Sequence, residues 1–141
     1  MKFFIVYLLL TSVSLEAPVI DKTEEKTREF YELCEQKGSD VLAASIIKLI
    51  SNPSDYHGKC IMTRGYLLLE HEYSYVFLTK NDYESSNTWN AVEIVAYGDE
   101  LNNYDYLNGH FIDLYGVVNV SHLDKGKPYH YIELTNIVAR P

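Results

Sequence analysis

The chain has 141 residues, with 20 acidic against 12 basic side chains and a formal net charge of −8. Hydrophobic residues make up 47% of it and include 13 tyrosines, which excludes a disordered protein and allows one domain with a packed core. The acidic balance disfavours nucleic-acid binding, which needs clustered Lys and Arg. The two cysteines exclude a disulfide-dense miniprotein and a four-cysteine zinc site.

The N-terminal segment has the pattern of a secretory signal peptide. A positive charge at Lys2 precedes an unbroken apolar run over 3–10, and the small residues Ser12 and Ser14 follow it. The run is too short for a transmembrane helix, which needs about 20 residues. We therefore expect a signal peptide over 1–14 and a periplasmic or secreted protein with no membrane span after cleavage. The alternative is an N-terminal strand or buried helix of a cytosolic protein.

The segment 22–37 lacks Gly and Pro and predicts a helix. Its apolar residues Phe30, Leu33 and Cys34 have helical spacing and form one narrow stripe. We assign 15–40 to an N-terminal helical segment.

A second helix is predicted over 41–50, with Asp40 as its N-cap and Pro53 beyond its end. Four of its residues are expected to face the core. They are Leu42, Ile46, Leu49 and Ile50.

From residue 59 onwards the hydrophobic period changes from that of a helix to that of a strand. Five segments rich in apolar and β-branched residues are separated by turn-like residues. They are 59–69, 75–79, 91–97, 111–120 and 129–138. The stretch 99–106, between the third and fourth strands, is expected to be a short helix or irregular.

Two of these strands share a glycine frame, because Gly58 and Gly65 recur with the same spacing as Gly109 and Gly116. The second glycine of each pair falls in mid-strand, which indicates a sharp bend or a bulge. Closed sheets need such bends at their corners. We therefore predict a mainly β domain over 41–141 with N-terminal helices, built as a five-stranded OB-like Greek-key barrel. The alternative is an α+β fold with an open antiparallel sheet.

The residues around these strands resemble a known group of proteins. The pattern is N-P-x-x-Y-x-G-K, then G-Y-L, then L-x-G, and it is carried here by Asn52-Pro53, Tyr56, Gly58-Lys59, Gly65-Tyr66-Leu67 and Leu107-Asn108-Gly109. It is similar to that of a group of small, uncharacterised, mostly bacterial proteins that look like OB-fold-like secreted domains. The resemblance covers residues 46–118. It implies an OB-like fold behind a signal sequence, with no established activity and no catalytic residues.

The sequence contains no recognised catalytic or metal-binding motif. The stretch Ser121-His122-Leu123-Asp124 has the letters of a catalytic triad, but neighbouring residues in a strand or turn point apart. In Glu70-His71-Glu72 an extended backbone would turn the imidazole away from both carboxylates, so we expect a solvated loop. We therefore assign no catalytic residue, no metal site and no cofactor.

Cys34 and Cys60 are the only cysteines. In an oxidising compartment a disulfide could join them, tying the first helix to the first strand. Such a bond would stabilise the fold by about 3–4 kcal/mol. The alternative is two separate buried thiols, since each cysteine also fits an apolar position.

Aromatic residues are frequent in the connections between the predicted strands, and in OB folds such connections border the ligand face. The candidate ligand-binding residues are Tyr73, Tyr75, Tyr83, Trp89 and Tyr129. Exposed Tyr and Trp rings stack on sugars or peptide segments. Tyrosine is also a common half-buried strand residue, which is the alternative interpretation.

These patterns favour a non-catalytic, secreted binding or protein-interaction domain. Its expected partner is a protein, a peptide or a carbohydrate, and no nucleic acid is expected. One alternative is an inhibitor or immunity-type protein that blocks a basic partner with its acidic surface. The other is a hydrolase or metal-dependent enzyme.

Overall fold

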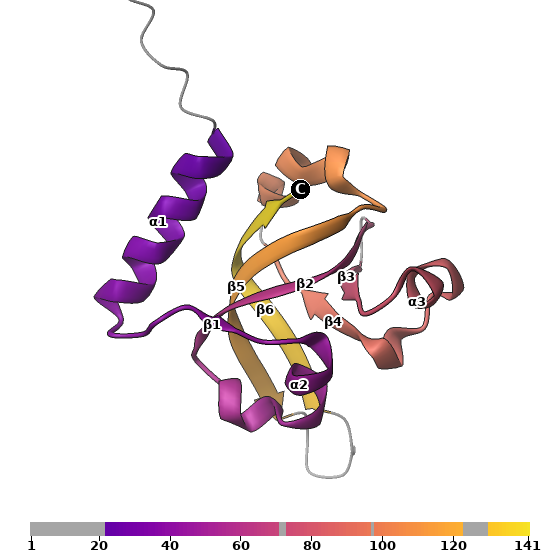
Figure 1. Ribbon diagram of the computed structural model, residues 1–141, viewed down its shortest axis with the longest axis horizontal. Helices are drawn as coiled ribbons and strands as arrows, with labels where there is room; N and C mark the ends of the chain where they lie inside the picture. Colours follow the sequence, from indigo (N-terminus) through magenta and orange to yellow (C-terminus); the bar gives the residue numbers. More distant parts are fainter. Residues whose placement is uncertain (1–21, 71–72, 97, 123–129) are drawn as a thin grey trace, which may run out of the picture.

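The computed structural model describes residues 22–70, 73–96, 98–122 and 130–141. They form an α+β fold in which helices and helical turns lie around a mixed sheet (Figure 1). The helices are α1 (Lys22–Gln36), α2 (Ile46–Ser51) and α3 (Lys80–Ser85), with 3-10 turns η1 (Pro53–Tyr56), η2 (Thr88–Asn90) and η3 (Gly98–Leu107). The strands are β1 (Leu42–Ala43), β2 (Cys60–Leu69), β3 (Ser74–Phe77), β4 (Ala91–Ile94), β5 (Phe111–His122) and β6 (His130–Arg140). The expected signal peptide at 1–14 lies outside the described residues.

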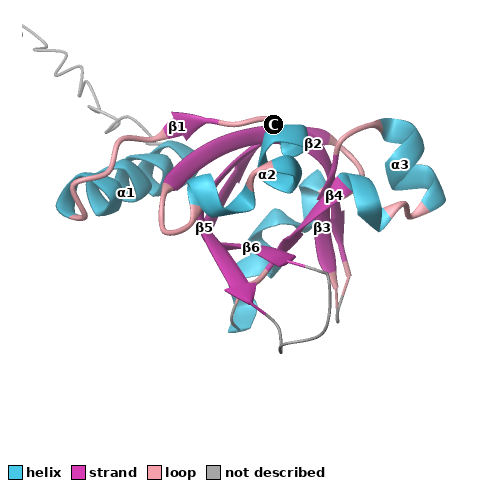
Figure 2. Cartoon of the chain, turned by 90° about the horizontal axis from the view of Figure 1, so that it is seen from below, coloured by secondary structure: helices cyan, strands magenta, loops and turns pink. Residues whose placement is uncertain are grey.

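The sheet has six strands in the order β1-β2-β3-β4-β6-β5, and β2 pairs in addition with β5 (Figure 2). The β1–β2 and β4–β6 pairings are parallel, and the others are antiparallel. The α+β class that the sequence allowed as an alternative is therefore confirmed. Its sheet is mixed rather than purely antiparallel, because β1 and β4 each run beside a strand of the same direction.

The main core lies between the sheet, α2 and η3. Alternate residues of the strands supply most of it, as the period of two predicts. Its members with 1% exposure or less are Ile46, Leu49, Ile61, Leu67, Val76, Val92, Ile112, Leu114, Val118, Leu134 and Ala139. Thr63 lies on the same side of β2 as Ile61 and Leu67 and is 1% exposed, and its hydroxyl has no hydrogen-bond partner among the described residues.

Gly65 lies where β2 changes partners, since Tyr66 pairs with both β3 and β5. A Cβ on Gly65 would meet the carbonyl oxygen of Phe77 and would lie 2.7 Å from Val76 Cγ2. Glycine therefore allows β3 to pass close to β2, as its mid-strand position predicts.

Gly116 lies at an irregularity in the pairing of β5 with β6, where the register shifts between Tyr115 and Val117. A Cβ there would lie 3.2 Å from the Cβ of Leu134. This is the bulge that the second glycine of the repeated frame indicates.

The first helix packs on the sheet through a second apolar cluster. Phe30 and Cys34, two residues of the predicted stripe, contact Tyr115, Val117 and Val138 on β5 and β6. The rings of Phe30 and Tyr115 meet edge to face, with centroids 5.9 Å apart.

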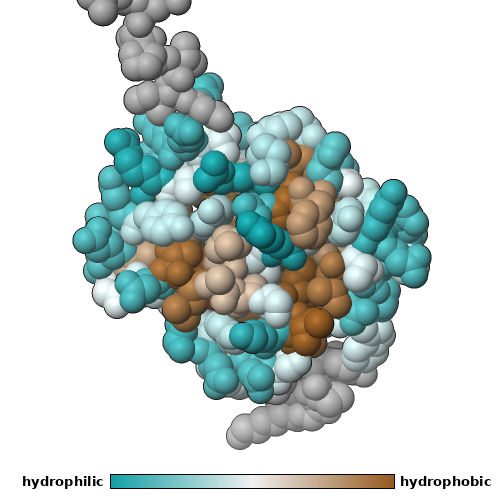
Figure 3. Space-filling view, viewed as in Figure 1, coloured by the Kyte–Doolittle hydropathy of each residue, from teal (hydrophilic) through white to brown (hydrophobic). Residues whose placement is uncertain are grey.

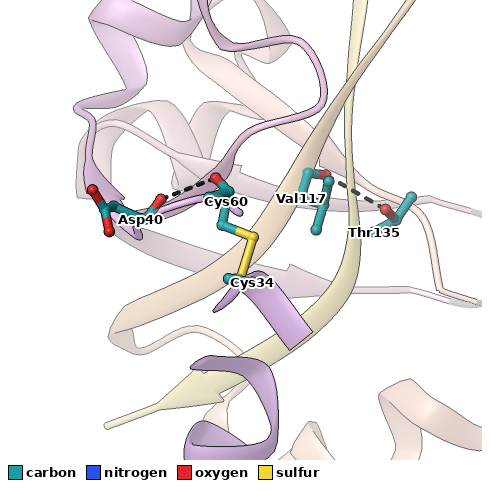
Figure 4. Close-up of a disulfide and its surroundings, with 6 residues drawn as sticks. Cys34, Asp40, Cys60, Val117 and Thr135 are labelled. Carbon is teal, nitrogen blue, oxygen red and sulfur yellow. Dashed lines mark hydrogen bonds between the residues drawn. A yellow bond between two sulfur atoms is a disulfide. The ribbon is translucent and has the colours of Figure 1, made fainter. Parts of the chain in front are cut away.

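A disulfide between Cys34 and Cys60 ties α1 to the start of β2 (Figure 4). The two Cα atoms lie 6.1 Å apart, and both cysteines are buried. The structure thus has the disulfide rather than two separate thiols. The bond spans 26 residues of sequence, for which loop-closure entropy gives a stabilisation of about 3.5 kcal/mol.

The second predicted helix is wrong over 41–45. Residues 42–43 form β1, which pairs in parallel with β2, and α2 begins only at Ile46. The N-cap is Ser45 rather than Asp40, because the Ser45 hydroxyl oxygen accepts a hydrogen bond from the Lys48 N–H at 3.2 Å.

Two of the four residues expected in the core from this segment are therefore outside it. Leu42 is 39% exposed and Ile50 is 36% exposed, whereas Ile46 and Leu49 are buried. A helix of six residues turns only one side toward the sheet, and that side holds Ile46 and Leu49.

Candidate functional site

The connection between β3 and β4 contains an ordered loop over residues 79–90, which includes α3 and η2. The sequence predicted strand up to residue 79, but β3 ends at Phe77 and Thr79 caps α3 instead. The Thr79 hydroxyl oxygen accepts a hydrogen bond from the Asp82 N–H at 3.1 Å. Ser86 ends the helix in the left-handed conformation, with φ of 54°. The spacing T-x-x-D, typical of a helix N-terminus, is the signal that could have revealed α3.

The carboxylate of Asp82 lies at the centre of this loop and is 8% exposed. It accepts hydrogen bonds from the Thr79 hydroxyl at 2.6 Å, the Asn87 amide at 2.8 Å and the Asn90 amide at 3.0 Å. These hydrogen bonds, that of Thr79 foremost, hold the pKa of Asp82 below its ordinary value, although burial opposes them. We call these four residues the Asp82 hub. An ionised Asp82 joins the beginning of the loop to its end.

Trp89 lies between two members of the hub, Asn87 and Asn90, and is 71% exposed. Hydrogen bonds also fix the backbone on both sides of Trp89. The Asn90 N–H donates to the Asn87 carbonyl at 3.1 Å, and the Asn90 carbonyl accepts from the Leu78 N–H at 2.9 Å. The loop therefore presents the indole on an ordered backbone.

Two apolar side chains on α2 are also exposed, Ile47 by 57% and Ile50 by 36%. They stand three residues apart and so on the same side of the helix. Because α2 contacts η2, we group these isoleucines with Trp89 as neighbouring parts of the surface. Apolar residues gather over α2 and the adjacent part of the sheet in the space-filling view (Figure 3). We call Trp89, Ile47 and Ile50 the Trp89 patch.

The sequence-based assignment missed the isoleucines of this patch because it placed Ile50 in the core and gave Ile47 no role. A signal was present in the composition of α2. Four of its six residues are Ile or Leu, which is more than one buried side of so short a helix can hold.

The elements that form and flank the patch are nearly neutral. Across α2, η1, α3 and η2 the exposed cations are Lys48 and Lys80, and the exposed anions are Asp55 and Glu84. The Lys80 Nζ atom lies 3.8 Å from Glu84 Oε1. The net charge of −8 therefore comes from other parts of the chain, apart from the buried carboxylate in the hub.

The structure does not bring the predicted aromatic residues together in one cluster. Tyr73 is 55% exposed and directly precedes β3, whereas Trp89 lies just before β4. Because β3 and β4 are antiparallel, these two residues lie at opposite ends of the hairpin. Tyr129 lies outside the described residues.

Tyr75 and Tyr83 are half-buried and pack against the buried ring of Phe77. Their ring centroids lie 5.9 Å and 6.0 Å from that of Phe77. Through Phe77, these two tyrosines take part in the packing of α3 against β3. Of the predicted ligand-binding residues, Trp89 and Tyr73 are the ones with strongly exposed rings among those described.

A cleft of about 220 Å³ lies between α1 and η3. Its lining includes Phe30, Leu33 and Ile137, and the Lys26 ammonium lies 5.2 Å from the centroid of the Tyr104 ring beside it. Ligand pockets for small molecules usually enclose about 300–1,000 Å³. This cleft is therefore a weaker candidate than the Trp89 patch.

Among the described residues, no three His, Cys, Asp or Glu side chains are placed to hold a metal ion. His71 and Glu72 of the segment Glu70-His71-Glu72 lie outside the described residues. Leu123 and Asp124 of the segment Ser121-His122-Leu123-Asp124 lie outside them as well. No helix within 22–70, 73–96, 98–122 and 130–141 is long and apolar enough to cross a membrane.

No protein-family model matches the chain, and no curated protein matches it. One similar solved structure is that of a candidate aspartyl-tRNA synthetase from Leishmania major Friedlin, with 12% sequence identity and a TM-score of 0.38. The match covers 71% of this chain and 21% of that protein, so the chain spans about a fifth of its length. A similarity this low carries no argument about fold or function.

Proposed function

We propose that this protein is a secreted, non-catalytic binding or protein-interaction domain that contacts its partner through the Trp89 patch. One observation carries the proposal. The only tryptophan of the chain is 71% exposed on a loop that a buried carboxylate holds in one conformation.

With 71% of its surface exposed, most of the Trp89 indole remains in water in the free protein. In a complex the same ring would become buried, and Trp is among the residues that contribute most to binding free energy at interfaces. The Asp82 hub orders the loop in advance, so less conformational entropy is lost on binding. The two isoleucines of the patch extend the apolar surface around the indole, as at the centre of protein interfaces.

For the finer fold we propose an OB-like Greek-key barrel over 41–141, behind a signal peptide at 1–14 and a helical segment at 15–40. The strand pairings support it, because they run β2-β3-β4-β6-β5 and return to β2. The close approach at Gly65 and the bulge at Gly116 supply the bends that such a barrel needs. The proposal agrees with the resemblance to small bacterial OB-fold-like secreted proteins.

The proposed location is the periplasm or the outside of the cell. The signal-like pattern at 1–14 supports it, and a buried disulfide is compatible with an oxidising compartment. Intact-mass analysis of the protein from its native host should show the loss of about 14 residues. A full-length product in the cytosol would contradict the proposed location.

The binding proposal is tested with Trp89→Ala and a matched control, Tyr106→Ala. Tyr106 is a 61% exposed aromatic residue on η3, outside the patch. Both variants should melt within a few degrees of the wild type, because both side chains are exposed. Each protein serves as bait for extracytoplasmic proteins of the native host, and captured partners are identified by mass spectrometry and purified.

Trp89→Ala should weaken binding to the purified partner by about 1–3 kcal/mol, and Tyr106→Ala should leave it unchanged. The same experiment is repeated with peptides and sugars as ligands, with the emission of Trp89 as the signal. Equal binding by the two variants would contradict the role of the patch. A Trp89→Ala variant that unfolds would show instead that Trp89 is needed for stability.

A further inference from the structure

We propose that the occupant of the Trp89 patch is a second copy of this chain, bound in a twofold symmetric dimer. The inference rests on the proposed function, because it names the partner of the same surface. Three properties of the patch support it: its exposure, its charge and the mixture of signs around it.

The exposure of Trp89 fits a partner that covers a wide area of the surface. A side chain that is 71% exposed stands out from the surface and does not line a pocket. Two cavities among the described residues, one between α1 and η3 and one at the C-terminal end of α1, are formed by residues outside the patch. A small ligand would cover one side of the indole only, whereas a protein surface can cover the indole together with Ile47 and Ile50.

The charge of the patch fits a second copy. Two chains of net charge −8 repel each other wherever their acidic surfaces meet. The exposed side chains of α2, η1, α3 and η2 sum to zero, and the ionised Asp82 of the hub adds one negative charge. Contact through the patch therefore brings together one excess negative charge per copy, of the eight that each chain carries. A basic partner would be attracted to an acidic surface elsewhere, such as the glutamates of α1, which lies on the opposite side of the sheet from α3 (Figure 1).

The mixture of signs suits a twofold axis. In a twofold dimer the same surface meets itself, so it must offer groups that complement one another. On α3, Lys80 and Glu84 lie 3.8 Å apart, and the neighbouring elements α2 and η1 carry Lys48 and Asp55, so each copy brings both signs to the contact. Charges of opposite sign at the rim would set the relative orientation of the two copies.

The experiment measures self-association of the disulfide-bonded protein by sedimentation velocity. Concentrations run from about 1 µM to about 500 µM, the range in which a weak dimer forms. Trp89 provides a second readout because it is the only tryptophan. As the protein is concentrated, its emission should shift to the blue and its quenching by acrylamide should fall, since the dimer removes the indole from water.

Ile47→Ser and Trp89→Ala should each weaken the dimer, while Tyr106→Ala should leave it unchanged. For Trp89→Ala we expect about 100-fold weaker association, because each of the two copies loses a contact that contributes about tenfold. Far-UV circular dichroism and thermal melting confirm that each variant is folded.

A wild-type protein that stays monomeric at the highest concentration would overturn the inference. So would a dimer that both patch variants retain, or one in which the Trp89 emission does not change with concentration. Failure of the dimer leaves the proposed function standing if a different partner still loses affinity for Trp89→Ala. If that variant changes neither self-association nor binding to any partner, the proposed function fails as well.

Discussion

Gly65→Ala should destabilise the protein, because the added methyl group has no room between β2, β3 and α2. The added Cβ would meet the Phe77 carbonyl oxygen and would lie 2.7 Å from Val76 Cγ2 and 2.8 Å from Ile46 Cδ1. Phe77 pairs with β2 on one side and with β4 on the other, so its carbonyl cannot move without disturbing both ladders.

The expected loss follows from two opposing effects. Inserting a methyl group into a packed region costs about 1–3 kcal/mol, and contact with backbone puts this case at the upper end. Alanine also restricts the unfolded chain, which stabilises the folded state by about 0.4–1 kcal/mol. The free energy of unfolding should therefore fall by about 2.5 kcal/mol, and the melting temperature by roughly 10 °C for a chain of this size.

Gly38→Ala is the matched control. Gly38 has a φ of +69°, and a Cβ there would meet nothing within 4 Å, so the cost is that of a left-handed backbone alone, about 1 kcal/mol. Urea unfolding followed by far-UV circular dichroism measures both variants, because the emission of an exposed Trp89 responds weakly to unfolding. If Gly65→Ala lowers the free energy of unfolding no more than Gly38→Ala does, then β3 does not pass as close to Gly65 as this prediction requires.

Three further predictions concern stability. Thr63→Val should raise the free energy of unfolding by about 1 kcal/mol, because it removes a buried hydroxyl without a hydrogen-bond partner among the described residues. The control Thr27→Val should not raise it, because the Thr27 hydroxyl donates a hydrogen bond to the Thr23 carbonyl at 2.7 Å. A loss of stability in Thr63→Val, measured by urea unfolding, would refute the reasoning. Replacing both Cys34 and Cys60 by alanine should cost about 3.5 kcal/mol, and an unchanged urea midpoint would contradict that estimate. Because the pKa of Asp82 is lowered, its ionised carboxylate contributes fully to the stability of the fold above the ordinary Asp pKa, and this contribution is lost as the pH falls through the lowered value. In thermal melts between about pH 2 and 7, the melting temperature of Asp82→Asn should therefore fall less on acidification than that of the wild type. Equal falls in the two proteins would refute this role of the carboxylate.

Local patterns in the sequence were sufficient for several elements. The spacing of Phe30 and Cys34 placed α1 and its buried side, since residues four apart share one side of a helix whatever surrounds them. Alternation located the long strands, and the repeated glycines marked Gly65 and Gly116 before their neighbours were known. The loop at 79–90 carried a local signal as well, in the T-x-x-D spacing that starts α3.

Exposure was decided by the tertiary structure. Ile46 and Ile47 are neighbours of the same type, yet one is fully buried and the other is 57% exposed, because the sheet covers only one side of α2. Burial depends on which distant segment covers a residue, and no local spacing contains that information. The same reason explains why the sequence could name Trp89 and Tyr73 together but could not show that they lie at opposite ends of a hairpin. It also explains why the Trp89 patch became visible only when α2 was found beside η2.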